Sequence, residues 1–136
     1  MKTILLLAAL LLGSVTFANT NVEITAKTTA VDEVSAKRAV DQYAYNFGYV
    51  RVYTRQYVSY TLTNTGTTPL TFSRAMIGGA GFDAYHTCNG VILPSQKCSF
   101  DIIFQPMSEF HHNGRFILSF MENLDIVVDV YGIGTR

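Results

Sequence analysis

The strongest constraint on the fold is a two-residue alternation of apolar and polar side chains. Val58, Tyr60 and Leu62 alternate with hydroxyl-bearing residues. Side chains of a β-strand point to its two faces in turn, so this spacing predicts a strand with one buried face. The same alternation recurs in three later segments, at residues 98–104, 116–120 and 126–131. A chain patterned in this way is expected to fold as packed β-sheets.

Turn-forming residues separate the alternating segments. Asn64-Thr65-Gly66 follows the first of them, and Gly66 is expected to adopt a positive φ there. The glycine cluster at residues 78–81 favours a bulge or a tight corner. Pro106 ends a strand, because proline cannot donate to the ladder. Further extended runs lie at residues 49–53, 70–76 and 82–86, with loops at 89–96 and 107–113. About seven short strands and almost no convincing helix predict an all-β fold, an antiparallel β-sandwich.

The N-terminus is typical of a secretory signal peptide. Lys2 precedes the apolar run Ile4 to Leu12, which is shorter than the about 20 residues that span a bilayer. Small residues at Thr16 and Ala18 place signal-peptidase cleavage after Ala18. No cysteine follows that point until Cys88, so no lipid anchor is expected at the mature N-terminus. The predicted product is secreted, either periplasmic or extracellular, and has no membrane span.

The chain divides into three parts: a signal peptide at 1–18, an N-terminal leader segment at 19–45 and a β-sandwich domain at 46–136. The leader segment is rich in Thr, Ala and charged residues, and its helix-compatible stretch is residues 32–40. Isolated helices this short are marginal, so we expect the leader segment to be flexible or partly helical. Val22, Ile24 and Ala26 alternate as a donated β-strand would.

Charge and cysteine content narrow the classes of partner. Without the signal peptide the chain carries one more acidic than basic residue. Its net charge therefore does not favour binding to nucleic acid or to an anionic membrane. Two cysteines in an exported chain predict one disulfide, Cys88 to Cys98. Closing this loop should stabilise the fold by roughly 2 to 3 kcal/mol. Two thiols at this spacing, without a second ligand pair, do not predict a metal site.

Longer motifs carry a family resemblance. They are YTLTNTGTTPLTF at residues 60–72, FDAYHTCNGVILPSQKCSFDIIFQP at 82–106 and VVDVYGIGT at 127–135. Together they resemble the Hydin-type (ASH) immunoglobulin-like domain family, relatives of the major sperm protein fold, over Phe47 to Thr135. The resemblance implies an immunoglobulin-like β-sandwich that serves as a non-enzymatic interaction or scaffolding module, with no catalytic residues. In exported bacterial members it also implies a cysteine pair such as Cys88 and Cys98. The loop at 107–113 is longer than this family commonly has.

A run of tyrosines is the main candidate for a binding surface. Tyr43, Tyr45, Phe47 and Tyr49 follow a spacing of two, so an extended strand would place all four on one face, and Tyr53 follows closely. Tyrosine is enriched where proteins meet partners. The same spacing equally fits a buried first strand, and the sequence favours neither interpretation.

His111 and His112 are a second candidate, because they lie with Glu109 in the loop at 107–113. Imidazoles and a carboxylate can hold a transition metal, with His86 as a third nitrogen ligand if the fold brings it near. Adjacent residues of an extended loop point apart, so a polar loop is the favoured interpretation, and we predict no metal site and no cofactor. No serine lies in a Gly-x-Ser-x-Gly elbow, and the glycines at 78–81 are not followed by the helix that a phosphate loop needs.

These features favour an exported, non-enzymatic binding or scaffolding module of the cell envelope or the extracellular space. Its expected partner is a protein or an envelope polysaccharide. The alternative is a structural subunit that assembles by edge-strand pairing or through a donated N-terminal strand. A third hypothesis, a small metal-dependent enzyme, rests on the three histidines alone. The sequence does not indicate the oligomeric state.

Overall fold

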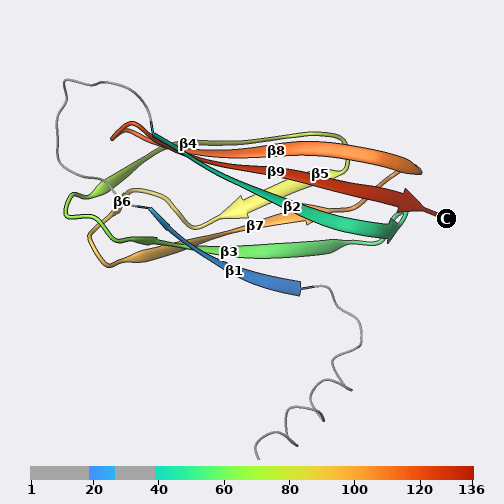
Figure 1. Cartoon of the computed structure of the whole chain (residues 1–136), viewed down its shortest axis with the longest axis horizontal. Helices are drawn as coiled ribbons and strands as arrows, with labels where there is room; N and C mark the ends of the chain where they lie inside the picture. Colours follow the sequence, from blue (N-terminus) through green and yellow to red (C-terminus); the bar gives the residue numbers. More distant parts are fainter. Residues whose placement is uncertain (1–18, 27–38) are drawn as a thin grey trace, which may run out of the picture.

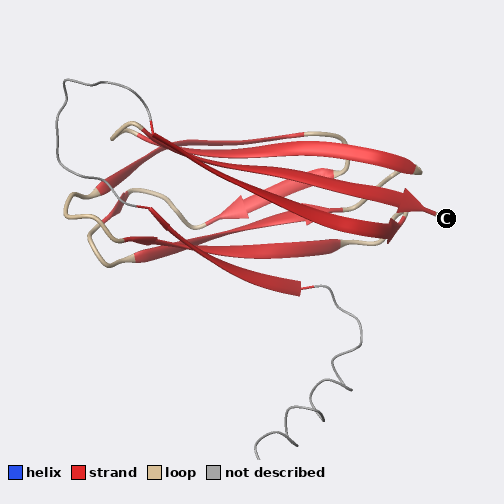
Figure 2. Ribbon diagram, in the orientation of Figure 1, coloured by secondary structure: helices blue, strands red, loops and turns tan. Residues whose placement is uncertain are grey.

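The chain folds as two facing β-sheets in a computed structural model that describes residues 19–26 and 39–136 (Figure 1). The described residues form nine strands and no helix (Figure 2). The strands are β1 (Asn19–Ala26), β2 (Ala39–Arg51), β3 (Gln56–Asn64), β4 (Leu70–Gly78), β5 (Phe82–His86), β6 (Val91–Ile92), β7 (Lys97–Phe104), β8 (Phe110–Phe120) and β9 (Leu124–Thr135). No helix among these residues is long and apolar enough to cross a membrane. The predicted all-β sandwich is confirmed, with nine strands in place of about seven.

The strand order separates the two sheets. One sheet has four strands in the order β1-β3-β7-β5, and the other has five in the order β2-β9-β8-β4-β6. Two pairs are parallel, β1 with β3 and β2 with β9, and the other pairs are antiparallel. The two N-terminal strands therefore each lie at a sheet edge, beside a strand far from them in the sequence.

The core lies between the sheets and is built from the alternation seen in the sequence. Val58, Leu62 and Ile102 are completely buried. The inward faces of β9 and of the second half of β8 are buried as well. Aromatic rings stack through the centre of the sandwich, with centroids 5.0 Å apart for Tyr60 and Phe100 and 4.8 Å apart for Phe100 and Phe116. Burial of apolar area and offset ring contacts are the main stabilising terms in such a core.

The N-terminal segment differs from the expectation of a flexible or partly helical leader. Residues 19–26 form β1, and β2 begins at Ala39, so this strand crosses the boundary that we placed between residues 45 and 46. Ile24 is only 4% exposed and belongs to the core cluster. The local signal was weak because β1 and β2 are specified by pairing with β3 and β9, which lie far along the chain. The signal peptide and the stretch 32–38 lie outside the described residues.

The turn after β3 is held by a side chain. Asn64 is fully buried, and its amide nitrogen donates to the carbonyl oxygens of Thr68 and Ile92, each at 2.9 Å. Its amide oxygen accepts from the backbone N–H of Gly66 at 2.9 Å. Gly66 is not among the residues with positive φ, so the role we expected for that glycine was wrong. The turn depends on the Asn64 amide instead, because it satisfies three backbone groups at once.

Two further expectations are confirmed. Cys88 and Cys98 form the disulfide, with their Cα atoms 5.0 Å apart. The corner between β4 and β5 uses Gly79 and Gly81 at φ of 114° and 87°, which favour glycine.

Candidate functional site

The tyrosine run on β2 is split by a β-bulge. The register with β9 shifts between Asn46 and Tyr49, and Gly48 has φ of 75° with its N–H donating to Asn46 Oδ1 at 2.8 Å. Before the bulge, Tyr43 and Tyr45 face the core. After it, Tyr49 turns outward and is 75% exposed. The run therefore supplies both core and surface, since one extra residue reverses the alternation.

The inward part of this run contributes to packing. The ring of Phe47 lies 4.9 Å from that of Tyr45 and 5.5 Å from that of Phe104. Burial, with a smaller contribution from the charge of Asp41, raises the pKa of Tyr43. Tyr53 lies in the connection between β2 and β3, is exposed, and donates its N–H to Pro106 O at 2.8 Å.

The two adjacent histidines lie on a strand. The expectation of a loop at 107–113 was wrong, because β8 begins at Phe110 and pairs with β9 through both histidines. His111 is exposed on the outer side. The ring nitrogens of His112 lie on the other side, 3.0 Å from Ser108 O and 3.3 Å from Ala80 O. Neighbouring residues of a strand must point to opposite faces, so these imidazoles cannot share a ligand.

The third histidine does not join them. Nδ1 of His86 accepts from the N–H of Cys88 at 3.2 Å, and its ring lies 5.1 Å from that of Phe72. Within residues 19–26 and 39–136, no three His, Cys, Asp or Glu side chains are placed to hold a metal ion. The three histidines thus do not form the site that the metal-enzyme hypothesis requires.

The solvent side of the five-stranded sheet, called the outer face below, carries side chains in rows across β4, β8 and β9. The register places Met76, Ile117 and Val127 beside one another as an apolar row. On one side of it lies a polar row, Arg74, Ser119 and Asp125. On the other side Gly78, Arg115 and Asp129 are aligned. Cross-strand neighbours of this kind are close enough to act on one ligand.

An ion pair lies in the third row. Arg115 Nε donates to Asp129 Oδ1 at 2.6 Å, and Gln42 Nε2 of β2 donates to Asp129 Oδ2 at 2.7 Å. The hydrogen bond from Arg115 lowers the pKa of Asp129 against the opposing effect of burial, and the bond from Gln42 lowers it further. The same pairing raises the pKa of Arg115. Both groups remain charged near neutral pH, and their charges compensate each other.

A hollow of about 400 Å³ opens beside this pair. The space in front of Gly78 is open, because a Cβ built there would meet no atom within 4 Å. Tyr131, which is 42% exposed, stands at its border. Its lining residues are Gly78, Gly79, Asn113, Gly114, Arg115, Asp129 and Tyr131. Apolar surface and a few convergent polar groups are typical of ligand sites.

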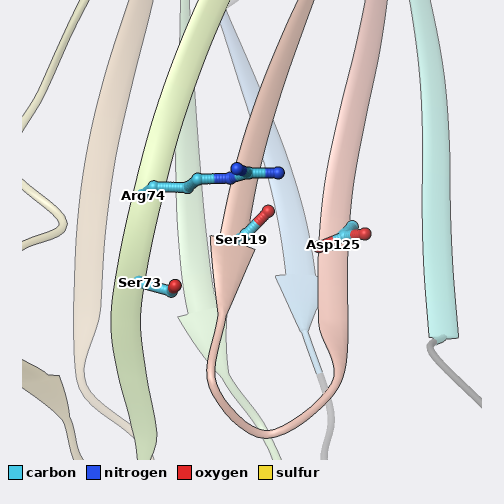
Figure 3. A pocket seen from close by; sticks show the side chains of 4 residues that line it. All are labelled: Ser73, Arg74, Ser119 and Asp125. Carbon is cyan, nitrogen blue, oxygen red and sulfur yellow. The ribbon is translucent and has the colours of Figure 1, made fainter.

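A second hollow of about 280 Å³ lies at the first polar row. Figure 3 shows the side chain of Arg74 extending from β4 across β8, in the direction of β9. Ser73, Ser119 and Asp125 complete its lining. The apolar row with Met76 lies between the two hollows.

The outer face carries two of the residues expected from sequence, although neither lines a hollow, and several residues that were missed. Tyr49 and His111 lie on the outer face, both paired with Ile133. Arg115, Asp129 and Tyr131 were not predicted. One signal was available in the sequence. Asp129 lies in the middle of the alternating run at 126–131, which marks it as an outward position. A side chain of opposite charge is then expected beside it on the neighbouring strand.

Comparisons with known proteins agree with the fold. A family model described as "HYDIN/CFA65/VesB-like, Ig-like domain" matches residues 36–132. The VesB protease of Vibrio cholerae is similar with a TM-score of 0.58 at 17% identity, over 74% of this chain and 32% of VesB. The secreted serine protease VesC of Vibrio cholerae gives 0.54 at 15% identity, over 65% of this chain and 21% of VesC.

A third similar structure is the ASH / PapD-like domain 7 of human CEP192, with a TM-score of 0.51 at 10% identity, over 74% of this chain and 83% of that one. No curated protein matches the chain. Identities this low show the fold alone. The chain spans only 21% to 32% of the lengths of the two proteases.

Proposed function

Because the chain belongs to the HYDIN/CFA65/VesB-like Ig-like domain family, we propose that it is an exported, non-enzymatic binding module of the cell envelope or the extracellular space. The resemblance to Hydin-type domains is thereby confirmed. One observation carries the proposal: the outer face of the five-stranded sheet has two hollows, at Gly78 and at Arg74, on either side of an apolar row. A partner on this face would contact the exposed Met76 and the groups that line the two hollows.

Export is supported by three features. The N-terminal sequence resembles a signal peptide with cleavage after Ala18. The disulfide between Cys88 and Cys98 suits an oxidising compartment. VesC, a structural relative, is described as secreted.

A non-enzymatic role is supported by the chemistry of the hollow at Gly78. Asp129 is its only acidic side chain, and Arg115 holds the pKa of that carboxyl below its ordinary value. General acid–base catalysis needs a group whose pKa lies near the working pH. Asp129 is thus suited to hold a ligand by hydrogen bonds and poorly suited to transfer protons.

The test is capture of partners by the purified mature protein from envelope extract and from a panel of envelope polysaccharides. The double variant Tyr49→Ser/Tyr131→Ser removes two exposed rings from the outer face, and Tyr57→Ser/Tyr85→Ser removes two exposed rings from the other sheet. We expect the first variant to lose most of the captured partner and the second to retain it. Capture of nothing by the wild type, or equal loss in both variants, would refute the proposed function of this face.

A second candidate, a subunit that assembles by a donated strand, is favoured by the placement of β1. This strand lies at a sheet edge, pairs parallel with β3 and buries Ile24 in the core, so another copy could supply the same strand. Light scattering coupled to size-exclusion chromatography tests this candidate. Strand donation predicts a dimer or a larger assembly that is lost when residues 19–26 are deleted. A monomer unchanged in mass by the deletion would exclude strand donation.

A further inference from the structure

Three strands, β4, β8 and β9, form the sides of the hollow at Gly78. Gly78 lies at the end of β4, where β6 no longer covers the strand, because β6 pairs only with Leu70 and Thr71. With no side chain at Gly78, a ligand can approach the strand backbone directly. Asn113 and Tyr131, a cross-strand pair of β8 and β9, form another side of the hollow.

Charge compensation selects a neutral ligand. Arg115 and Asp129 neutralise each other through hydrogen bonds of 2.6 Å and 3.3 Å, so the hollow offers no net charge to an anion or a cation. The pair instead presents N–H donors beside carboxylate acceptors, and the Asn113 amide offers one of each. Vicinal hydroxyl groups, which donate and accept at adjacent positions, match this arrangement.

The apolar surfaces suit the same ligand class. Tyr131 and Tyr49 lie in adjacent rows of the outer face, and both rings are exposed. A sugar ring has an apolar face that packs on an aromatic side chain, while its hydroxyls lie at the edge. Arg74 and Gly78 are four residues apart on β4, so the two hollows are about 13 Å apart at the rise of a strand. Two hollows joined by the apolar row of Met76 fit a chain of sugar residues better than a single ring.

We propose that the outer face binds a neutral polysaccharide chain, with one sugar residue seated in the hollow at Gly78 and the chain continuing over Met76 toward Arg74. This inference rests on the proposed function as a binding module and names the class of its partner. A competing occupant is an extended peptide that pairs with the uncovered edge of β4. It would use backbone groups and would depend little on Arg115.

The experiment uses the isotope-labelled mature protein and series of neutral glucan and β-1,4-linked N-acetylglucosamine oligosaccharides of increasing length. We expect amide shift changes at Gly78, Gly79, Arg115 and Tyr131, and an affinity that rises with chain length. Gly78→Val should block access to the strand backbone in the hollow while keeping the fold, since Gly78 has no positive φ and space is open there. It should weaken binding at least tenfold, as should Arg115→Met. Tyr85→Ser, on the other sheet, should bind like the wild type, and thermal unfolding should show all three variants folded.

The outcomes separate this inference from the proposed function. If envelope extract yields a protein partner through the outer face while no oligosaccharide shifts these amides, the inference fails and the binding module stands. If neither is bound, both fail. If an oligosaccharide binds and Gly78→Val binds it as tightly as the wild type, the hollow is not the subsite and the inference is overturned.

Discussion

At the scale of single residues, buried polar groups carry the sharpest consequences. Asn64 and Tyr60 are both buried inside the sandwich. Asn64 is satisfied by three hydrogen bonds, and the ring of Tyr60 stacks on that of Phe100. For Asn64, a substitution costs stability when it leaves buried carbonyl groups without a hydrogen-bond donor. For Tyr60, ionisation costs stability because it places a charge in the core.

Replacing Asn64 should show this cost directly. Asn64→Asp removes both donors toward the carbonyl oxygens of Thr68 and Ile92 and places a carboxylate beside them. We expect the free energy of unfolding at pH 7 to fall by about 3 to 5 kcal/mol, with partial recovery toward pH 4 as the acid gains a proton. Asn46→Asp is the matched control, because its exposed side chain serves as an acceptor for Gly48 and keeps that role. Equal losses in the two variants, measured by urea unfolding, would contradict this account of the turn.

Tyr60 predicts an alkaline limit to stability. Burial raises its pKa from 10.0 to about 12. The folded state therefore holds the phenolic proton more tightly than the unfolded chain. The contribution of this proton to the free energy of unfolding is complete below pH 10 and is lost as the pH rises from about 10 to about 12. The loss amounts to about 3 kcal/mol at 1.36 kcal/mol per pKa unit.

Tyr60→Phe has no proton to lose and should show a smaller fall in stability over this pH range. Urea unfolding of both proteins at pH 8, 10 and 11 measures the difference. Parallel curves for the two proteins would show that Tyr60 ionises as easily in the fold as in the unfolded chain.

At the scale of elements, the bulge in β2 decides which side chains reach the outer face. Gly48 is the extra residue between the pairs Asn46–Tyr131 and Tyr49–Ile133, and it sits at φ of 75°. A bulge also protects an edge strand against pairing with other chains. β2 is therefore better protected as an edge than β1, which has a continuous register with β3.

The bulge makes a two-part prediction. Gly48→Val should lower the free energy of unfolding by about 1 to 2 kcal/mol, because a β-branched residue does not tolerate positive φ. Deleting Gly48 should restore a regular ladder in which Tyr49 still faces outward and Val50 inward, so the deletion should be tolerated better than the substitution. Chemical denaturation measures both, and the reverse order of stability would refute the assignment of Gly48 as the bulge residue.

At the scale of the whole molecule, one covalent link and one packed core hold the sheets. The Cys88–Cys98 bond closes the segment that contains β6 onto β7. The double variant Cys88→Ala/Cys98→Ala should unfold with a free energy lower by about 2 to 3 kcal/mol, since the open segment gains conformational freedom when unfolded. Comparison by urea unfolding with Tyr85→Ser, which leaves the link intact, measures this effect, and an unchanged midpoint would count against it.

What the sequence determined by itself is the part of the fold that repeats locally. The period of two in β3, β7, β9 and the second half of β8 assigns those strands and their buried faces, because alternation is a property of adjacent residues. Two cysteines leave one possible pairing within the chain, and the glycines between β4 and β5 mark a corner through their own φ preference.

Only the tertiary structure decided the rest. β1 and the first half of β2 show only short alternating runs in the sequence, and they form strands because β3 and β9 offer them backbone partners from far along the chain. The same holds for the outer face: Arg115 and Asp129 become a pair, and Gly78 a hollow, through the register of three strands. The extra residue in the β2 bulge places Tyr49 on the outer face, whereas Tyr43 and Tyr45 face the core. Register is set by long-range pairing, and a shift of one residue moves a side chain from the core to the solvent.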